Sequence, residues 1–83
     1  MALLYKATKE VVKLNPGNGK TFTLAELQAA VGGMIEAVPG TRGRALCNEE
    51  GRMLNLPRNE NASNLFGMAL VGDVIVLEKG DRA

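Results

Sequence analysis

The apolar segments of this 83-residue chain are short and closely spaced, and this spacing restricts the possible folds more than any other feature. Strand-like segments occur at residues 2–7, 11–14, 33–38, 44–48 and 71–77, with a brief return strand at 52–54. The connections between most of these segments are too short for parallel crossovers, so antiparallel pairing should dominate. Segment 71–77 is rich in β-branched residues and almost continuously apolar, which predicts a central or doubly covered strand.

The clearest helix signal lies in the middle of the N-terminal half. Thr23 is followed three residues later by Glu26, a spacing that fits a capping box with Thr23 as the N-cap. Gly32 supplies a left-handed stop, so the sequence predicts a helix over residues 24–31. The apolar stripe of this helix consists of Leu24, Leu27 and Val31.

A second, shorter helix is predicted near the C-terminus. Asn59 and Asn61 are both good N-cap residues, and the segment after them lacks strand alternation, which favours a helix at about residues 60–66. The expected fold class is therefore α+β. It comprises one domain over residues 1–83, with about five mainly antiparallel strands, one firm helix and one short helix. Residues 15–19 are expected to form a loop, and residues 78–83 a polar tail.

The composition limits the size of the core. The chain has no Trp, one Tyr and two Phe, so small aliphatic side chains must fill most of the interior. A domain of this size buries only about 60–65% of its unfolded surface. Such chains often gain stability by pairing with copies of themselves, and a homo-oligomer is therefore expected. No apolar run approaches the length of a membrane span, so no membrane association is expected.

Several functional classes are disfavoured by residue usage. The chain has no His, which excludes a His-based catalytic centre within one chain, and no nucleophile–base pair is visible, so an enzyme is not expected. No cofactor and no metal site are expected either. The single Cys47 fits a reducing cytoplasm and a buried strand position. A net charge of +1 is not the basic excess of a domain that binds long nucleic acid.

Two residue types nevertheless gather in the middle of the chain. Arginine and asparagine together offer forked cations for phosphate and paired donors and acceptors for a base or ribose edge. Glu36 is predicted mid-strand, where it faces water or meets an Arg or a ligand amine, and Tyr5 is able to stack a base or to fill the core. The candidate ligand-binding residues are Arg42, Arg44, Arg52, Arg58, Asn48, Asn59, Glu36 and Tyr5. The alternative is a solvated loop region in which these side chains serve turns and caps.

The segment Asn48–Gly51 has the composition of a tight turn. Two adjacent glutamates precede Gly51, and this glycine is expected to adopt a positive φ. A Cβ atom at such a position costs about 1 kcal/mol or more, so the residue type would be fixed by backbone conformation.

Three segments resemble a small uncharacterised domain family that occurs mainly in phages and mobile elements. Residues 27–36 are similar to one half of its signature, and residues 47–59 to the other half, which reads Asn-Glu-Glu-Gly and then Leu-Pro-x-Asn. Residues 71–76 are similar to its closing strand. The resemblance implies a virus-encoded accessory protein that works in the cytoplasm of a bacterial host, and it implies no catalytic residues.

Small phage proteins of this size include oligomeric sponges, which sequester the nucleotide signals of bacterial defence without cleaving them. The leading hypothesis is therefore a non-enzymatic binding protein for a small cyclic or dinucleotide-like immune signal. The alternative is a protein–protein interaction module that inhibits or adapts a host protein. An exposed apolar patch would favour the second hypothesis.

Overall fold

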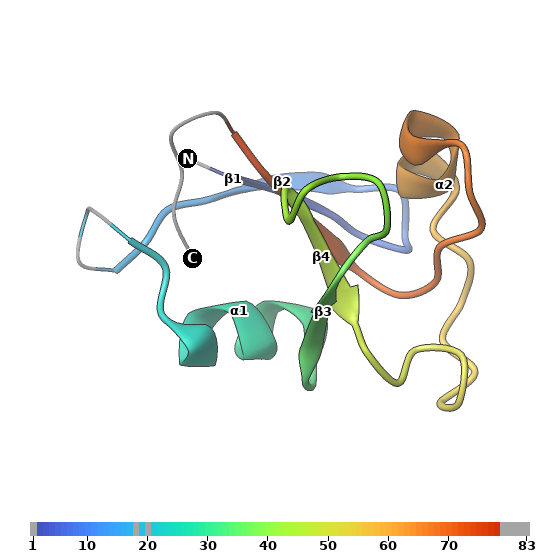
Figure 1. Ribbon diagram of the computed structural model, residues 1–83, viewed down its shortest axis with the longest axis horizontal. Helices are drawn as coiled ribbons and strands as arrows, with labels where there is room; N and C mark the ends of the chain where they lie inside the picture. The colour runs from blue at the N-terminus through green and yellow to red at the C-terminus, as the bar shows by residue number, and fades with distance from the viewer. Residues whose placement is uncertain (1, 18, 20, 79–83) are drawn as a thin grey trace.

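A computed structural model describes residues 2–17, 19 and 21–78 of the chain (Figure 1). Parts of the predicted loop at 15–19 and of the predicted polar tail lie outside these residues. Within the described residues, five strands form one antiparallel sheet in the order β2-β1-β5-β4-β3, and two helices accompany it. The strands are β1 (Ala2–Tyr5), β2 (Val11–Leu14), β3 (Ile35–Ala37), β4 (Ala45–Asn48) and β5 (Val74–Leu77). The predicted α+β class with antiparallel pairing is confirmed.

The last strand, β5, occupies the middle of the sheet, as its apolar sequence predicts. All four β5 residues, from Val74 to Leu77, pair with β1. On its other side, β5 pairs with Ala45 and Leu46 of β4. The strand is shorter than the predicted segment 71–77, because Gly72 adopts a left-handed φ of 72° and interrupts the extended backbone. Val71, on the far side of this interruption, makes only an isolated bridge.

Helix α1 (Leu24–Val31) begins and ends where the sequence predicts. The Thr23 hydroxyl accepts a hydrogen bond from Glu26 N–H at 3.1 Å, and the Glu26 carboxylate accepts one from Thr23 N–H at 2.9 Å. Gly32 ends the helix with a φ of 76°. These hydrogen bonds, and another from Gly17 N–H, lower the pKa of Glu26. The capping contribution of this carboxylate is therefore present above its ordinary pKa and is lost as the pH falls through the lowered value.

The expected apolar stripe of α1 is only partly correct. Leu27 and Val31 are buried, but Leu24 is 58% exposed. Helical side chains lean toward the N-terminus of their helix, so a side chain in the first turn points past the end of the covered surface.

We predict that Thr23→Ala lowers the free energy of unfolding by about 1 kcal/mol, because the helix loses its N-cap acceptor. The measurement is urea unfolding at neutral pH. Thr8→Ala is a matched control, because Thr8 is exposed and, within the described part of the chain, its hydroxyl bonds only to the nearby Glu10 side chain. A Thr23→Ala protein as stable as its parent would show that the cap does not contribute.

The two faces of the sheet carry separate apolar clusters. Helix α1 lies against one face, below the sheet in Figure 1, and its side chains pack with Leu4, Leu46 and Ile75. The other face carries a cluster that includes Ala45, Cys47 and Val74 together with residues of the segment around α2 (Glu60–Phe66). Helix α1 also contacts β3 and β4, whereas the opposite face at Cys47, near the end of β4, packs with the segment around α2.

The predicted return strand at residues 52–54 is wrong. Residues 49–55 instead form consecutive turns, in which Leu54 N–H bonds to Glu50 C=O and Leu56 N–H bonds to Gly51 C=O. The cause lies in the sheet order, because β4 has β3 on one side and β5 on the other. Because β4 pairs with β5 only at Ala45 and Leu46, a returning strand would find a free edge at just Cys47 and Asn48, which is too short to pair a strand.

Candidate ligand-binding site

A hollow of about 330 Å³ lies at the end of β4. The pairing of β4 with β5 stops after Leu46 and Ile75, so the end of β4 has no strand partner on that side. The turn after β4 and the segment 68–71 lie around this gap. The lining comes from β3, β4, residues 49–52 and residues 68–71, and we call this feature the β4 hollow.

The β4 hollow combines charges of both signs with an apolar surface. Glu36 on β3, Glu49 and Arg52 line it, and all three residues are exposed. Cys47 and Leu70 contribute apolar surface and are buried. Pockets that bind small molecules are usually apolar with a few convergent polar groups, and their volumes begin at about 300 Å³. The volume of the β4 hollow therefore suits a single nucleotide better than a dinucleotide.

Cys47 is part of the hollow but is not an activated nucleophile. Burial raises the pKa of the Cys47 thiol, and the negative charge of Glu36 raises it further. The thiol therefore stays protonated at neutral pH. Glu36 and Cys47 are register partners on the paired strands β3 and β4. This pairing places the Glu36 carboxylate near the Cys47 thiol, which explains its effect on the pKa of that thiol.

The turn after β4 is tight, as predicted, but Gly51 is not required for the predicted reason. Gly51 N–H bonds to Asn48 C=O at 3.1 Å, which closes the turn, yet the residue has no positive φ. A Cβ atom at Gly51 would lie 2.9 Å from Val71 Cγ2 and 3.3 Å from the Asn48 oxygen. Glycine is needed here because the turn approaches Val71 closely, and this approach helps to shape the hollow.

Asn48 reaches the hollow, but its amide group is used within the protein. Its Nδ2 donates to Val31 C=O at 3.2 Å, and its Oδ1 accepts from Glu50 N–H at 2.8 Å. The residue is 5% exposed. Asn48 therefore fixes the end of α1 to the turn that carries Glu49 and Arg52, and its contribution to a ligand site is positional.

Asn59 does not reach the hollow. Its side chain is fully buried and makes three hydrogen bonds. The Nδ2 atom donates to Tyr5 C=O at 2.6 Å and to Gly72 C=O at 2.9 Å. The Oδ1 atom accepts from Ala62 N–H at 3.0 Å. Asn59 is thus the N-cap of α2 and also links β1 to the segment before β5. Tyr5 is half-buried, packs against the apolar cluster on that face and is not among the residues that line the hollow. The structure brings neither residue to the candidate site.

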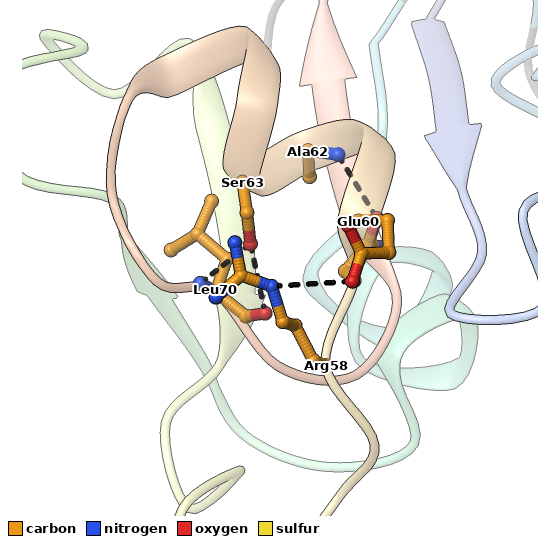
Figure 2. Close-up of polar contacts among 6 residues, drawn as sticks. Arg58, Glu60, Ala62, Ser63 and Leu70 are labelled. Atoms are coloured by element: carbon orange, nitrogen blue, oxygen red, sulfur yellow. Dashed lines mark hydrogen bonds and ion pairs between the residues drawn. The ribbon is translucent and has the colours of Figure 1, made fainter.

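The four predicted arginines do not gather in one place. Only Arg52 lines the β4 hollow. Arg42 and Arg44 belong to the connection between β3 and β4, where Arg44 Nη2 donates to Leu77 C=O at 3.3 Å. Arg58 lies 3.5 Å from a Glu60 oxygen at the start of α2 (Figure 2). The expected cluster of four guanidinium groups within one chain is therefore not formed.

Other contacts near the hollow were not predicted. The Ser63 hydroxyl of α2 donates to Leu70 C=O at 3.2 Å and accepts from Leu70 N–H at 2.9 Å (Figure 2). This pair holds the segment 68–71 that lines the hollow. The sequence gives no signal for the pairing, because a single buried serine has no periodic pattern. Glu49 was expected to be solvated at the turn, and it is exposed but also lines the hollow.

A second hollow of about 370 Å³ lies between β2 and α1. It is lined mainly by apolar residues such as Leu14, Phe22 and Leu27. Its charged residue, Glu26, is already hydrogen-bonded to the N–H groups of Gly17 and Thr23. The β4 hollow is therefore the better candidate for a polar ligand.

Within the described residues, no cluster of three or more His, Cys, Asp or Glu side chains is placed to hold a metal ion. In the same part of the chain, no helix has the length and apolar character needed to cross a membrane. Residues 2–83 match the model of a protein family described as "Domain of unknown function (DUF3846)". No curated protein and no solved structure matches the chain.

Proposed function

We propose a function for this chain, which belongs to the DUF3846 family, whose description assigns no activity. In this proposal the protein is non-enzymatic and sequesters a small anionic nucleotide in the β4 hollow. One observation carries the proposal. The hollow gathers Glu36, Asn48 and Arg52, three of the residues that the sequence singles out, from β3, β4 and the following turn. Arg52 supplies the cation for a phosphate, and the carboxylates supply acceptors for a base or ribose.

The biological role is part of the same proposal. The resemblance of segments 27–36, 47–59 and 71–76 to phage proteins supports a virus-encoded accessory protein in the cytoplasm of a bacterial host. There it would act as a sponge for a nucleotide immune signal. Because Cys47 stays protonated and the chain has no His, binding without cleavage fits the available chemistry.

A homo-oligomer fits this role. Among the described residues, one β4 hollow is lined by a single guanidinium group, that of Arg52. A cyclic dinucleotide has two phosphates and two bases, so two copies of the hollow would be needed to match it. Light scattering with and without such a ligand measures whether copies associate.

We predict that Arg52→Ala weakens nucleotide binding by roughly ten- to a hundredfold, because a charge-assisted contact is worth roughly 1.5–3 kcal/mol. A thermal-shift screen against linear, cyclic and cyclic di-nucleotides first identifies the ligand, since binding to the folded state raises the melting temperature. Calorimetric titration of the best ligand then compares the variants. Arg42→Ala is the matched control, since Arg42 is exposed and lies outside the hollow.

Equal losses of affinity in the Arg52→Ala and Arg42→Ala proteins would place the ligand elsewhere. A screen without any nucleotide that raises the melting temperature would overturn the proposal. It would favour the protein–protein interaction module, which one observation supports. Met53 and Leu54, in the turns beside the hollow, are 78% and 55% exposed, which is unusual for adjacent large apolar side chains.

A further inference from the structure

The charged side chains that line the β4 hollow are either hydrogen-bond acceptors only or donors only, and this difference determines which base would fit. On the side chains, the carboxylates of Glu36 and Glu49 provide acceptors only, and the guanidinium of Arg52 provides donors only. Glu36 is the carboxylate with the best-defined position, because its backbone is held on β3 opposite Cys47. A ligand that satisfies Glu36 must offer donors, preferably two that lie side by side.

We propose that the β4 hollow selects a guanine nucleotide, with the Glu36 carboxylate accepting hydrogen bonds from the base and Arg52 contacting the phosphate. This inference rests on the proposed nucleotide-binding function and specifies its ligand. The base edge of guanine carries two adjacent donors, N1–H and the 2-amino group, which match the two oxygens of a carboxylate. Adenine and cytosine each pair an amino donor with a neighbouring ring-nitrogen acceptor, which a carboxylate repels. Uracil offers one donor between two acceptors.

The main chain that lines the hollow offers a hydrogen-bond donor for O6, the acceptor on the same edge of guanine. Among the described residues, the N–H and C=O of Ala69 make no hydrogen bond, although Ala69 lines the hollow. Its N–H is available to the O6 acceptor of guanine. The Ser63–Leu70 hydrogen bonds hold the neighbouring residue, so the position of Ala69 is set before a ligand arrives.

The apolar part of the hollow suits a purine ring. Leu70 and Val71 line it beside Cys47, and the volume of about 330 Å³ accommodates one base with its sugar and phosphate rather than two. The phosphate would then lie toward solvent, where the exposed Arg52 side chain meets it.

The test compares three nucleotides that differ only at the base edge. Guanosine, inosine and adenosine 5′-monophosphates are titrated calorimetrically into the parent protein. Inosine lacks the 2-amino group, so it keeps one donor to Glu36 and loses the other. We expect guanosine monophosphate to bind about tenfold more tightly than inosine monophosphate, and adenosine monophosphate to bind more weakly still.

Glu36→Gln supplies the decisive variant, because glutamine keeps the size of the side chain but replaces one acceptor with a donor. We expect its affinity for guanosine monophosphate to fall about tenfold and the difference between guanine and adenine to disappear. Glu50→Gln is the matched control, since it makes the same change of charge on an exposed residue that does not line the hollow. Melting temperatures of the variants establish that both are folded.

The possible results separate this inference from the function on which it rests. If the parent binds nucleotides without preferring guanine, or if Glu36→Gln keeps the preference, the inference is overturned while the proposed function stands. A preference for adenine would assign the base to the free N–H and C=O of Ala69 instead. If none of the nucleotides in the wider screen binds, the proposed function itself fails, and the inference fails with it.

Discussion

Asn59→Ala is expected to lower the free energy of unfolding by roughly 3 kcal/mol. The substitution removes the N-cap of α2, which is worth about 1 kcal/mol. It also leaves the carbonyl groups of Tyr5 and Gly72 without their donor, and each buried unsatisfied group costs about 1–3 kcal/mol. Because small domains have little stability to lose, the variant should unfold at a much lower urea concentration than the parent.

Asn61→Ala provides the matched control for this result. Asn61 lies two residues further on, and its side chain donates one exposed hydrogen bond, to Lys9 C=O at 3.1 Å. Its replacement should change the stability by less than about 1 kcal/mol. If both variants lost the same small amount, the buried amide of Asn59 would not be the link between β1, α2 and β5 that its contacts imply.

The same contrast explains which elements can be predicted from sequence. Both helices begin and end as predicted because their signals are local. Thr23 and Asn59 accept hydrogen bonds from the first turn of each helix, and Gly32 and Gly67 end them in a left-handed conformation. All of these determinants lie within a few residues of the helix that they define, so no tertiary information is needed.

The errors arise where the answer depends on partners that are distant in sequence. The return strand at 52–54 is absent because β4 pairs with β3 on one side and with β5 at Ala45 and Leu46 on the other, which leaves a free edge of only two residues. Gly51 is fixed by the proximity of Val71, twenty residues later, and not by its own φ. Neither fact can be derived without the order of strands in the sheet.

The candidate site shows the same limit more strongly. Arginines that are neighbours in sequence are separated in the fold, since Arg44 contacts Leu77 C=O and Arg58 pairs with Glu60. The asparagines that suggested base recognition have their amide groups occupied by the main chain at Asn48 and Asn59. Residue type alone does not distinguish an amide that caps a helix from one that contacts a ligand.

The segments 27–36 and 47–59, which lie far apart in the sequence, are in contact. Glu49 N–H bonds to Met34 C=O at 2.8 Å, and Asn48 Nδ2 bonds to Val31 C=O, so residues 31–34 and 48–50 form one unit. Val31 is the last residue of α1, whose terminal carbonyl groups lack partners within the helix. These hydrogen bonds join the end of α1 to the turn that carries Glu49 and Arg52.

Asn48→Ala is accordingly expected to lower the free energy of unfolding by about 2 kcal/mol, since Val31 C=O and Glu50 N–H both lose a buried or partly buried partner. Urea unfolding provides the measurement. Asn64→Ala is the control, because Asn64 is exposed on α2 and its replacement should be neutral or slightly stabilising.

The Asn48→Ala protein should also bind the proposed ligand more weakly, because the turn that positions Arg52 loses its anchor. Arg52→Ala should instead lower the affinity with little change in stability.

A double-mutant cycle with Gly33 makes this prediction specific. A Cβ atom at Gly33 would lie 2.9 Å from Asn48 Nδ2, and the backbone of Gly33 has no positive φ that would itself disfavour alanine. Gly33→Ala should therefore destabilise the parent by displacing the Asn48 amide, but should cost little once Asn48 is already alanine. We expect a coupling energy of about 1 kcal/mol or more, as is usual for residues in direct contact. Additive effects would show that the amide of Asn48 does not join α1 to the turn, and the positional role of Asn48 in the β4 hollow would then be wrong.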